Sequence, residues 1–264
     1  MQTWESAKRV VIKVGSSTLT YETGNINIRR VEQLVKVLAD LKNAGKDIIL
    51  VSSGAIAVGV GKVGLPERPK DTPTKQAMAS VGQCELMYIY DKLFTQYNHK
   101  VAQVLLTRDI VDLPERKVHV QNTFERLLEM GVIPIVNEND AVAVEEIEFG
   151  DNDSLSAMVA TLTGADTLLI LSDIDGLYDK NPRVAADAKR IEVVEKITEE
   201  IYAMASGAGS NRGTGGMITK LHAAQWAGEH GIETVVLNGS RPENLYDVLE
   251  GQPVGTRFLA QKPQ

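Results

Sequence analysis

The sequence predicts an α/β protein, a three-layer αβα sandwich built on a mainly parallel central sheet. Short runs rich in β-branched residues alternate with longer segments that carry apolar residues at helical spacing. Glycine-rich and polar sequence follows several of the expected strands, which is where ligands bind in open α/β sheets. The length of 264 residues, with 43% hydrophobic and 24% charged residues, suits one large α/β domain or two small ones.

The expected elements follow from periodicity and from the residues that end each run. Strands are expected at residues 9–14, 47–51, 101–106, 132–136, 167–171 and 233–237. Helices are expected at residues 31–41, 74–96, 117–130, 154–162, 217–229 and 243–249. Because helices separate the strands, the sheet should be mainly parallel and covered on both faces. A hairpin-like stretch at residues 145–149 is expected to be antiparallel.

Charge and cysteine content exclude several classes of protein. The net charge of -7, from 28 basic and 35 acidic residues, argues against a general nucleic-acid binder but permits a local phosphate site. The single cysteine, Cys84, allows no disulfide framework and fits a cytoplasmic protein. We expect Cys84 to be a packing residue, because no His or Lys lies nearby in sequence to activate it. No apolar signal core or membrane-spanning stretch is recognised.

The turn after the first strand is the first candidate site. Lys13 lies near the end of an apolar strand, and Gly15-Ser16-Ser17 follows at once. Glycine lets the backbone approach a ligand closely, and successive backbone amides can form an anion-binding nest. The alternative is an edge lysine that extends to solvent before an ordinary turn. The segment alone leaves both interpretations open.

Two more turns favour an anion. Ser52-Ser53-Gly54 follows the second strand and opens a helix, whose N-terminal amides attract negative charge. Residues 213–220 form a glycine-rich turn that enters a helix, with Lys220 about one turn in; the alternative there is a flexible surface loop. Three such turns together favour a phosphate site.

The remaining motifs give weaker evidence about function. Residues 59–64 match G-x-G-x-x-G, but they lie well after the strand and run into Leu65-Pro66, so we interpret them as a helix end and loop. No Walker-type G-x-x-x-x-G-K-[ST] sequence occurs. The four histidines are scattered, and we expect no zinc site or catalytic triad.

Acidic and amide side chains cluster in residues 137–140 and 150–153. Helix capping explains one of them, Asp153 or Asn152, and not the whole set. We therefore expect a pocket in which carboxylate and amide groups hold the ammonium of a polar substrate. A carboxylate there could also orient lysines or a metal ion.

These segments together resemble the amino-acid kinase family. The resemblance runs from Val10 to about Phe258, and it is carried by residues 11–17, 51–56, 103–107, 137–140, 150–153 and 213–220. Family members that act on aspartate, acetylglutamate or UMP usually carry Gly-Gly or Ser-Gly where this chain has Gly15-Ser16-Ser17. The match is therefore to the branch that phosphorylates L-glutamate. Asn181-Pro182 departs from the Asp-Pro that many members carry.

The resemblance implies a single amino-acid kinase domain over residues 1–264. Its N-terminal part, about residues 1–165, should mainly bind substrate, and its C-terminal part, about residues 166–264, should mainly bind nucleotide. Many members of this branch carry a C-terminal PUA domain, and none is expected within this sequence. The resemblance further implies a homo-oligomer, either a dimer or a tetramer.

The implied activity is ATP-dependent phosphorylation of the side-chain carboxylate of L-glutamate, the first step of proline biosynthesis. ATP and Mg²⁺ are the implied cofactors, with the metal bound largely through phosphates and water. Proline carries the same α-carboxylate and a cationic amine, so feedback inhibition at an overlapping site is expected. We expect neither nucleic acid nor membrane as a partner.

Roles for individual residues follow from the same resemblance. Lys13 and Lys220 are the candidate catalytic charges, and Asp153 should hold both in place. Candidate substrate-binding residues are Ser53, Gly54, Asp140 and Asn152. Candidate ATP-binding residues are Lys13, Gly15, Ser16, Ser172, Asp173, Thr214, Gly215, Gly216, Met217, Ile218, Thr219 and Lys220.

Two rival functions remain open at this stage. One is a kinase of the same family that acts on another small acid, such as aspartate or carbamate. The other is a non-catalytic sensor of ATP or an amino acid, although a sensor would not need Lys13, Lys220 and Asp153 together. A regulatory RNA-binding protein lacks the basic balance.

Overall fold

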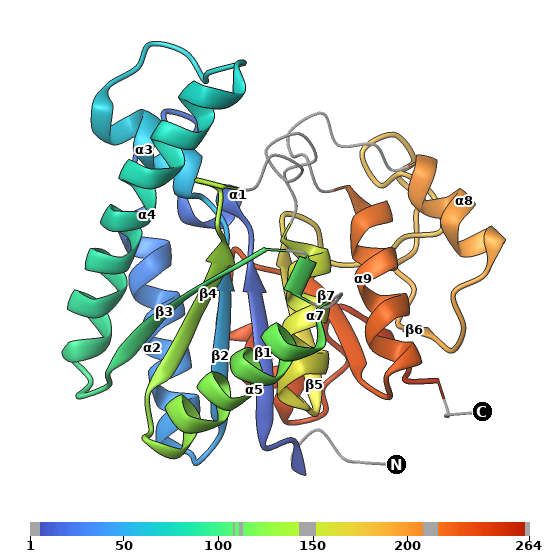
Figure 1. The fold of residues 1–264 in the computed structure, drawn as a ribbon. Coiled ribbons are helices and arrows are strands. Elements are labelled where there is room, and N and C mark those ends of the chain that lie inside the picture. Colours follow the sequence, from blue (N-terminus) through green and yellow to red (C-terminus); the bar gives the residue numbers. More distant parts are fainter. Residues whose placement is uncertain (1–5, 108, 111–112, 143–151, 208–215, 262–264) are drawn as a thin grey trace.

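The computed structural model describes residues 6–107, 109–110, 113–142, 152–207 and 216–261 (Figure 1). Within these residues one eight-stranded sheet has the order β3-β4-β2-β1-β5-β7-β8-β6. Its strands are β1 Arg9–Val14, β2 Asp47–Ser52, β3 Val101–Leu106, β4 Ile133–Glu138, β5 Thr167–Ser172, β6 Val193–Val194, β7 Glu233–Asn238 and β8 Thr256–Phe258. In this described part only the pairing of β7 with β8 is antiparallel.

Helices cover both faces of the sheet. They are α1 Ser16–Leu19, α2 Ile28–Asn43, α3 Ala55–Val63, α4 Thr72–Thr95, α5 Pro114–Glu129, α7 Asp153–Thr163, α8 Glu199–Gly207, α9 Met217–Glu229 and α10 Asn244–Leu249. One hydrophobic core lies between the sheet and α2, α4 and α10, and a second lies between the sheet and α5, α7, α8 and α9. The predicted three-layer αβα sandwich is confirmed.

The alternation of side chains along β1 decides where its lysine points. Val10, Ile12 and Val14 belong to the core under α2 and α4, whereas Val11 belongs to the core under α7 and α9. Successive strand residues face opposite sides of a sheet, so Lys13 shares the face of Val11. The lysine therefore lies under the N-termini of α7 and α9.

Most predicted elements are confirmed, with shifts of a few residues at their ends. β4 runs on to Glu138, past the predicted end at residue 136, so Asn137 lies inside a buried strand. The sequence analysis missed α1, α8, β6 and β8. Three of these have only two to four residues, too few to show a periodic pattern. The expected hairpin at residues 145–149 lies outside the described residues.

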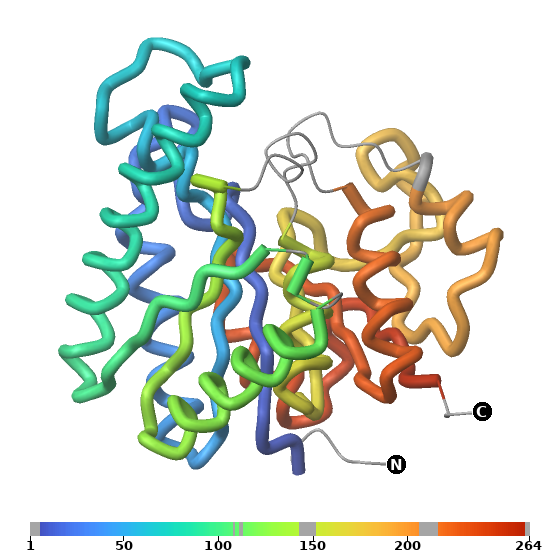
Figure 2. Tube along the Cα trace, viewed as in Figure 1, coloured from blue at the N-terminus to red at the C-terminus, as the bar shows by residue number. Residues whose placement is uncertain are grey.

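Helices α3 and α4 pack at backbone contact. A Cβ at Gly82 would lie 1.8 Å from the carbonyl oxygen of Ala55, and one at Gly59 would lie 1.9 Å from that of Met78. The segment at residues 59–64 is thus the second half of α3, which ends at Gly64, and its interpretation as a helix end is confirmed. Figure 2 shows this helix pair rising above the carboxyl ends of the strands on one side of the molecule.

Within the described residues, no helix is both long and apolar enough to cross a membrane.

Candidate active site

A buried charge cluster lies at the carboxyl edge of the sheet. Lys13 comes from β1, Asp153 is the first residue of α7, and Lys220 lies in the first turn of α9. The Lys13 Nζ is 2.6 Å from Asp153 Oδ1, and the Lys220 Nζ is 2.9 Å from Asp153 Oδ2. Each lysine side chain is 6% exposed and the Asp153 side chain is 0% exposed. The lysine of β1 does not extend to solvent, so that alternative is wrong.

The described side chains of the cluster surround one carboxylate with donors. Two ammonium groups share one carboxylate, and the Thr219 hydroxyl also donates to Asp153 Oδ2 at 3.0 Å. Asp153 gains further stabilisation from the positive end of the α7 dipole. Buried ion pairs recover little more than their desolvation penalty, so stability alone does not explain this arrangement. Two ammonium groups beside an anion-binding turn fit an anionic ligand.

The Gly15 turn borders this cluster. Gly15 is the N-cap of the one-turn helix α1, whose first amides have no intrahelical acceptor. A Cβ at Gly15 would lie 3.9 Å from both Lys13 Nζ and Ser17 Oγ. The missing side chain therefore leaves room beside the Lys13 amine for a ligand oxygen.

The turn after β2 is tied to the same edge. The Ser53 amide donates to the Val14 carbonyl at 3.0 Å, which joins the ends of β1 and β2. Gly54 then starts α3 with a φ of 103°, a conformation that favours glycine. Ser53 and Gly54 therefore lie next to the Gly15 turn.

Asn152 does not cap α7 with its side chain, and the carboxylate of Asp153 is committed to the lysines. Asn152 occupies the N-cap position of α7, as expected, but its side chain makes no capping hydrogen bond to the helix. Instead the Asn152 Nδ2 donates to Asn137 Oδ1 at 2.7 Å and to the Ser52 carbonyl at 3.2 Å. The side chain is held at the ends of β2 and β4 because its amide serves the sheet edge and not the helix.

Asp140 lies just beyond β4 and lines a cavity of about 430 Å³ together with Gln83, Gln103 and Glu138. Burial raises the pKa of the Asp140 carboxyl to about 6. The carboxylate makes no hydrogen bond or ion pair to another described residue. A desolvated carboxylate with no cation beside it in this part of the chain fits an ammonium ligand.

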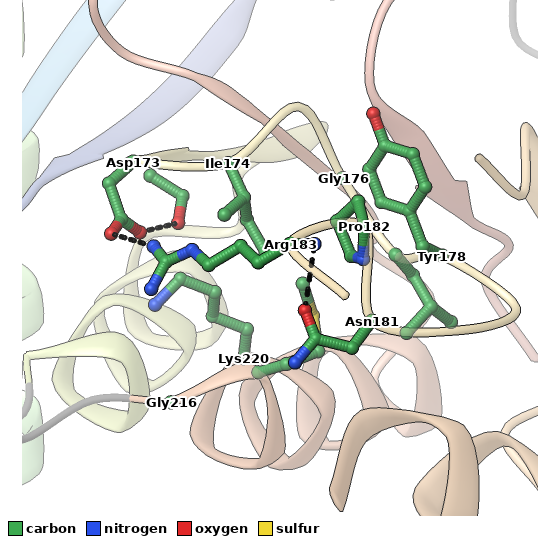
Figure 3. Close-up of a pocket in the computed structure, with 12 residues that line it drawn as sticks. Asp173, Ile174, Gly176, Tyr178, Asn181, Pro182, Arg183, Gly216 and Lys220 are labelled. Carbon is green, nitrogen blue, oxygen red and sulfur yellow. Dashed lines mark hydrogen bonds and ion pairs between the residues drawn. The ribbon is translucent and has the colours of Figure 1, made fainter. Parts of the chain in front are cut away.

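A second pocket borders the charge cluster at Lys220 (Figure 3). It is lined by Ser172 at the end of β5, by residues 173, 174, 176–178 and 181–183 of the following loop, and by Gly216, Met217 and Lys220 at the start of α9. Thr219 reaches Asp153, and Ile218 packs against the core between α7 and α9. Thr214 and Gly215 lie outside the described residues.

Arg183 was not singled out in the sequence analysis, although it follows Asn181-Pro182 in the loop noted there. Its guanidinium lies 3.6 Å from the Asp173 carboxylate and crosses this pocket (Figure 3). The open volume is about 30 Å³, enough for about one water molecule. Both side chains are half-exposed, and exposed ion pairs contribute only about 0–1 kcal/mol, so Arg183 can move aside for a larger ligand.

The model of the amino acid kinase family matches residues 8–238. The chain belongs to the amino acid kinase family. It is 56% identical over 262 residues to a glutamate 5-kinase of Clostridium perfringens, covering 98% of this chain and 97% of the relative. It is 53% identical to a glutamate 5-kinase of Listeria innocua, covering 98% and 96% of the two chains.

Solved structures share the fold of this chain at low sequence identity. A UMP kinase from Ureaplasma parvum superposes with a TM-score of 0.67 at 17% identity, covering 96% of this chain and 99% of that one. Within the described residues no group of three or more His, Cys, Asp or Glu side chains could hold a metal ion.

Proposed function

We propose that this protein is a glutamate 5-kinase, which transfers the γ-phosphate of ATP to the side-chain carboxylate of L-glutamate and so starts proline biosynthesis. The observation that carries the proposal is the buried Lys13–Asp153–Lys220 cluster, with a pocket that Lys220 lines and a cavity lined by Asp140 just beyond β4. The 56% identity over nearly full length to a protein of that name supports the choice of substrate.

The chemistry requires charge neutralisation more than proton transfer. A glutamate side chain has a pKa of about 4.3, so the nucleophile is already ionised at neutral pH and needs no general base. The main obstacle is repulsion between the carboxylate and the polyphosphate. Positioning and electrostatic stabilisation dominate phosphoryl transfer. Lys13 and Lys220 supply positive charge on two sides of the transferring group, and Asp153 fixes the distance between their amines.

ATP is proposed to bind with its γ-phosphate against the amides of Gly15 and Ser16, beside the Lys13 amine. Ser172, Asp173 and residues 214–220 would hold the rest of the nucleotide. Mg²⁺ supplies further neutralisation of the phosphates, and it is commonly held by one or two carboxylates, phosphates and water. The residues present fit that mode, because Asp173 is an acidic side chain that lines the pocket.

Glutamate is proposed to bind on the opposite side of the lysines. Asp140 is the partner for its α-ammonium, because this carboxylate is desolvated and no described residue offers it a cation. Asn152, Ser53 and Gly54 would complete the substrate contacts. An acetylated amine would bury the Asp140 charge without a counter-charge, so N-acetylglutamate should be a poor substrate.

Three finer features rest on the family resemblance. The part before about residue 165 would bind mainly substrate and the part after it mainly nucleotide. Proline would inhibit by competing with glutamate, and inhibition without competition would refute an overlapping site. The protein would assemble as a dimer or tetramer, which sedimentation would test.

The activity is tested by ADP release with ATP, Mg²⁺ and a panel of small acids. We expect ADP formation with L-glutamate and not with L-aspartate or carbamate. Hydroxylamine should trap the acyl phosphate as a hydroxamate. Turnover with another acid alone would refute the substrate, and ligand binding without any turnover would favour the sensor.

A further inference from the structure

A chain of side-chain amides leads from the surface of α4 to Asn152. The Gln83 Nε2 donates to Gln103 Oε1 at 3.1 Å, and the Asn137 Nδ2 donates to Gln83 Oε1 at 2.9 Å. The Asn152 Nδ2 then donates to Asn137 Oδ1 at 2.7 Å. We call Gln103, Gln83, Asn137 and Asn152 the amide relay. Every amide in it donates in the same direction, so the orientation of one sets that of the next.

The Asn152 end of the amide relay is linked through Ser52 to helix α4, the helix that carries Gln83. The Asn152 Nδ2 also donates to the Ser52 carbonyl at 3.2 Å, and the Ser52 hydroxyl lies 2.9 Å from the Tyr90 hydroxyl. Gln83 and Tyr90 are two helical turns apart on α4 and so share one face. Helix α4 therefore holds the polar side chains at the carboxyl ends of β2 and β4 from two points.

The amide relay decides which atom Asn152 offers. Both Nδ2 hydrogens of this buried side chain have acceptors, Asn137 Oδ1 and the Ser52 carbonyl. No described residue donates to its Oδ1. The backbone amide of Glu138 also donates to Asn137 Oδ1, at 2.9 Å, which favours the same orientation of the Asn137 amide. Asn152 is thus left with an acceptor for a ligand, and an ammonium group donates only.

We propose that Gln83 is a positioning residue for the α-amine of the substrate. Its Oε1 fixes the Asn137 amide, and Asn137 in turn keeps the Asn152 carbonyl directed to the ligand. Without that acceptor the Asn137 amide loses the partner of its Nδ2 and turns more freely. The Asn152 Nδ2 is then held by the Ser52 carbonyl alone, so the Asn152 amide turns more readily and can meet the ammonium with hydrogens in place of an oxygen. The inference rests on the proposed function.

The decisive comparison is between variants that remove and keep the acceptor. Gln83→Met removes it at similar size, and Gln83→Lys replaces it with donors only. Gln83→Glu keeps an oxygen toward the Asn137 Nδ2. Gln96→Met makes the same change at an exposed position at the end of α4, outside the amide relay and the Asp140 cavity, and is the matched control. Gln83 is partly exposed, so these replacements should be compatible with folding, which circular dichroism checks.

We expect Gln83→Met and Gln83→Lys to raise KM for L-glutamate by about 10-fold or more, the effect of losing a hydrogen bond to a charged group, without changing KM for ATP. Glutarate, the same diacid without the amine, should keep its inhibition constant against glutamate within about 3-fold, because it makes no such bond. Gln83→Glu and Gln96→Met should stay close to the unmodified protein.

Equal weakening of glutamate and glutarate would overturn the role of Gln83, because it would indicate a general structural defect. An unchanged KM for glutamate in Gln83→Met, or a Gln83→Glu variant as impaired as Gln83→Met, would overturn it as well. Absence of glutamate-dependent ADP release in the unmodified protein would instead refute the proposed function, and this inference with it.

Discussion

Replacing Asp140 by asparagine should make the protein more stable and a poorer enzyme at the same time. Burial raises the pKa of this carboxyl from 3.8 to about 6, so the folded state disfavours its charged form. At about 1.4 kcal/mol per pH unit, that rise corresponds to about 3 kcal/mol lost by the folded state at neutral pH. The Asp140 side chain is only partly buried, and asparagine still buries a polar group. We therefore expect the free energy of unfolding of Asp140→Asn to be about 1–2 kcal/mol higher than that of the unmodified protein.

The gain should depend on pH in a defined direction. Between pH 3.8 and about 6 the folded state binds the proton more tightly than the unfolded state, so this carboxyl lowers stability as the pH rises. Below that window the carboxyl is protonated in both the folded and the unfolded state. The difference in the free energy of unfolding between Asp140→Asn and the unmodified protein should then disappear. Urea denaturation of both proteins at pH 8 and at pH 3.5 measures it, with the slope m as a check on two-state unfolding.

The same variant should raise KM for L-glutamate and leave KM for ATP unchanged, because a neutral amide no longer pairs with the α-ammonium. The KM of the unmodified protein should rise as the pH falls through about 6, and that of Asp140→Asn should not. Two results would refute the reasoning: equal stability at pH 8, or an effect on KM for ATP alone. The first would mean that Asp140 has a cationic partner in the folded protein.

Other predictions concern the charge cluster and the helix contact. Lys13→Ala and Lys220→Ala should each lower kcat by about 100-fold or more while changing KM little, since each removes charge stabilisation at the transferring group. Steady-state kinetics measures this effect. Unchanged turnover in either variant would exclude that lysine from a role in the transition state. Asp153→Asn leaves two buried ammonium groups without their carboxylate and should reduce the free energy of unfolding by about 3–5 kcal/mol, with an unchanged urea midpoint as the contrary result. Gly82→Ala places a methyl group 1.8 Å from the Ala55 carbonyl oxygen, so it should lower stability by about 2 kcal/mol or more in a thermal melt, and a wild-type melting temperature would contradict the α3–α4 contact.

Local pattern was enough for the architecture and for singling out Lys13 and Lys220 as candidates beside glycine turns. Strand β1 and helix α9 could be placed because apolar residues recur at the period of each element, and Gly15 and Gly54 mark turns because glycine relaxes the limits on backbone geometry. Elements such as β6 and β8 escaped detection, since two or three residues carry no period. Arg183 and Gln83 escaped as well, because nothing in their sequence neighbourhood differs from an ordinary loop or helix.

The sequence by itself determined the fold class and the chemistry at hand, namely two lysines, a set of carboxylates and amides, and three glycine turns. Only the tertiary structure decided that Lys13 and Lys220 meet on opposite oxygens of Asp153, and that the Asn152 side chain joins the amide relay and makes no capping hydrogen bond. Residues far apart in the chain meet there because parallel strands bring their carboxyl ends, and the N-termini of the following helices, to one edge of the sheet. Which atom a side chain offers at that edge depends on partners from other elements, and no local pattern encodes them.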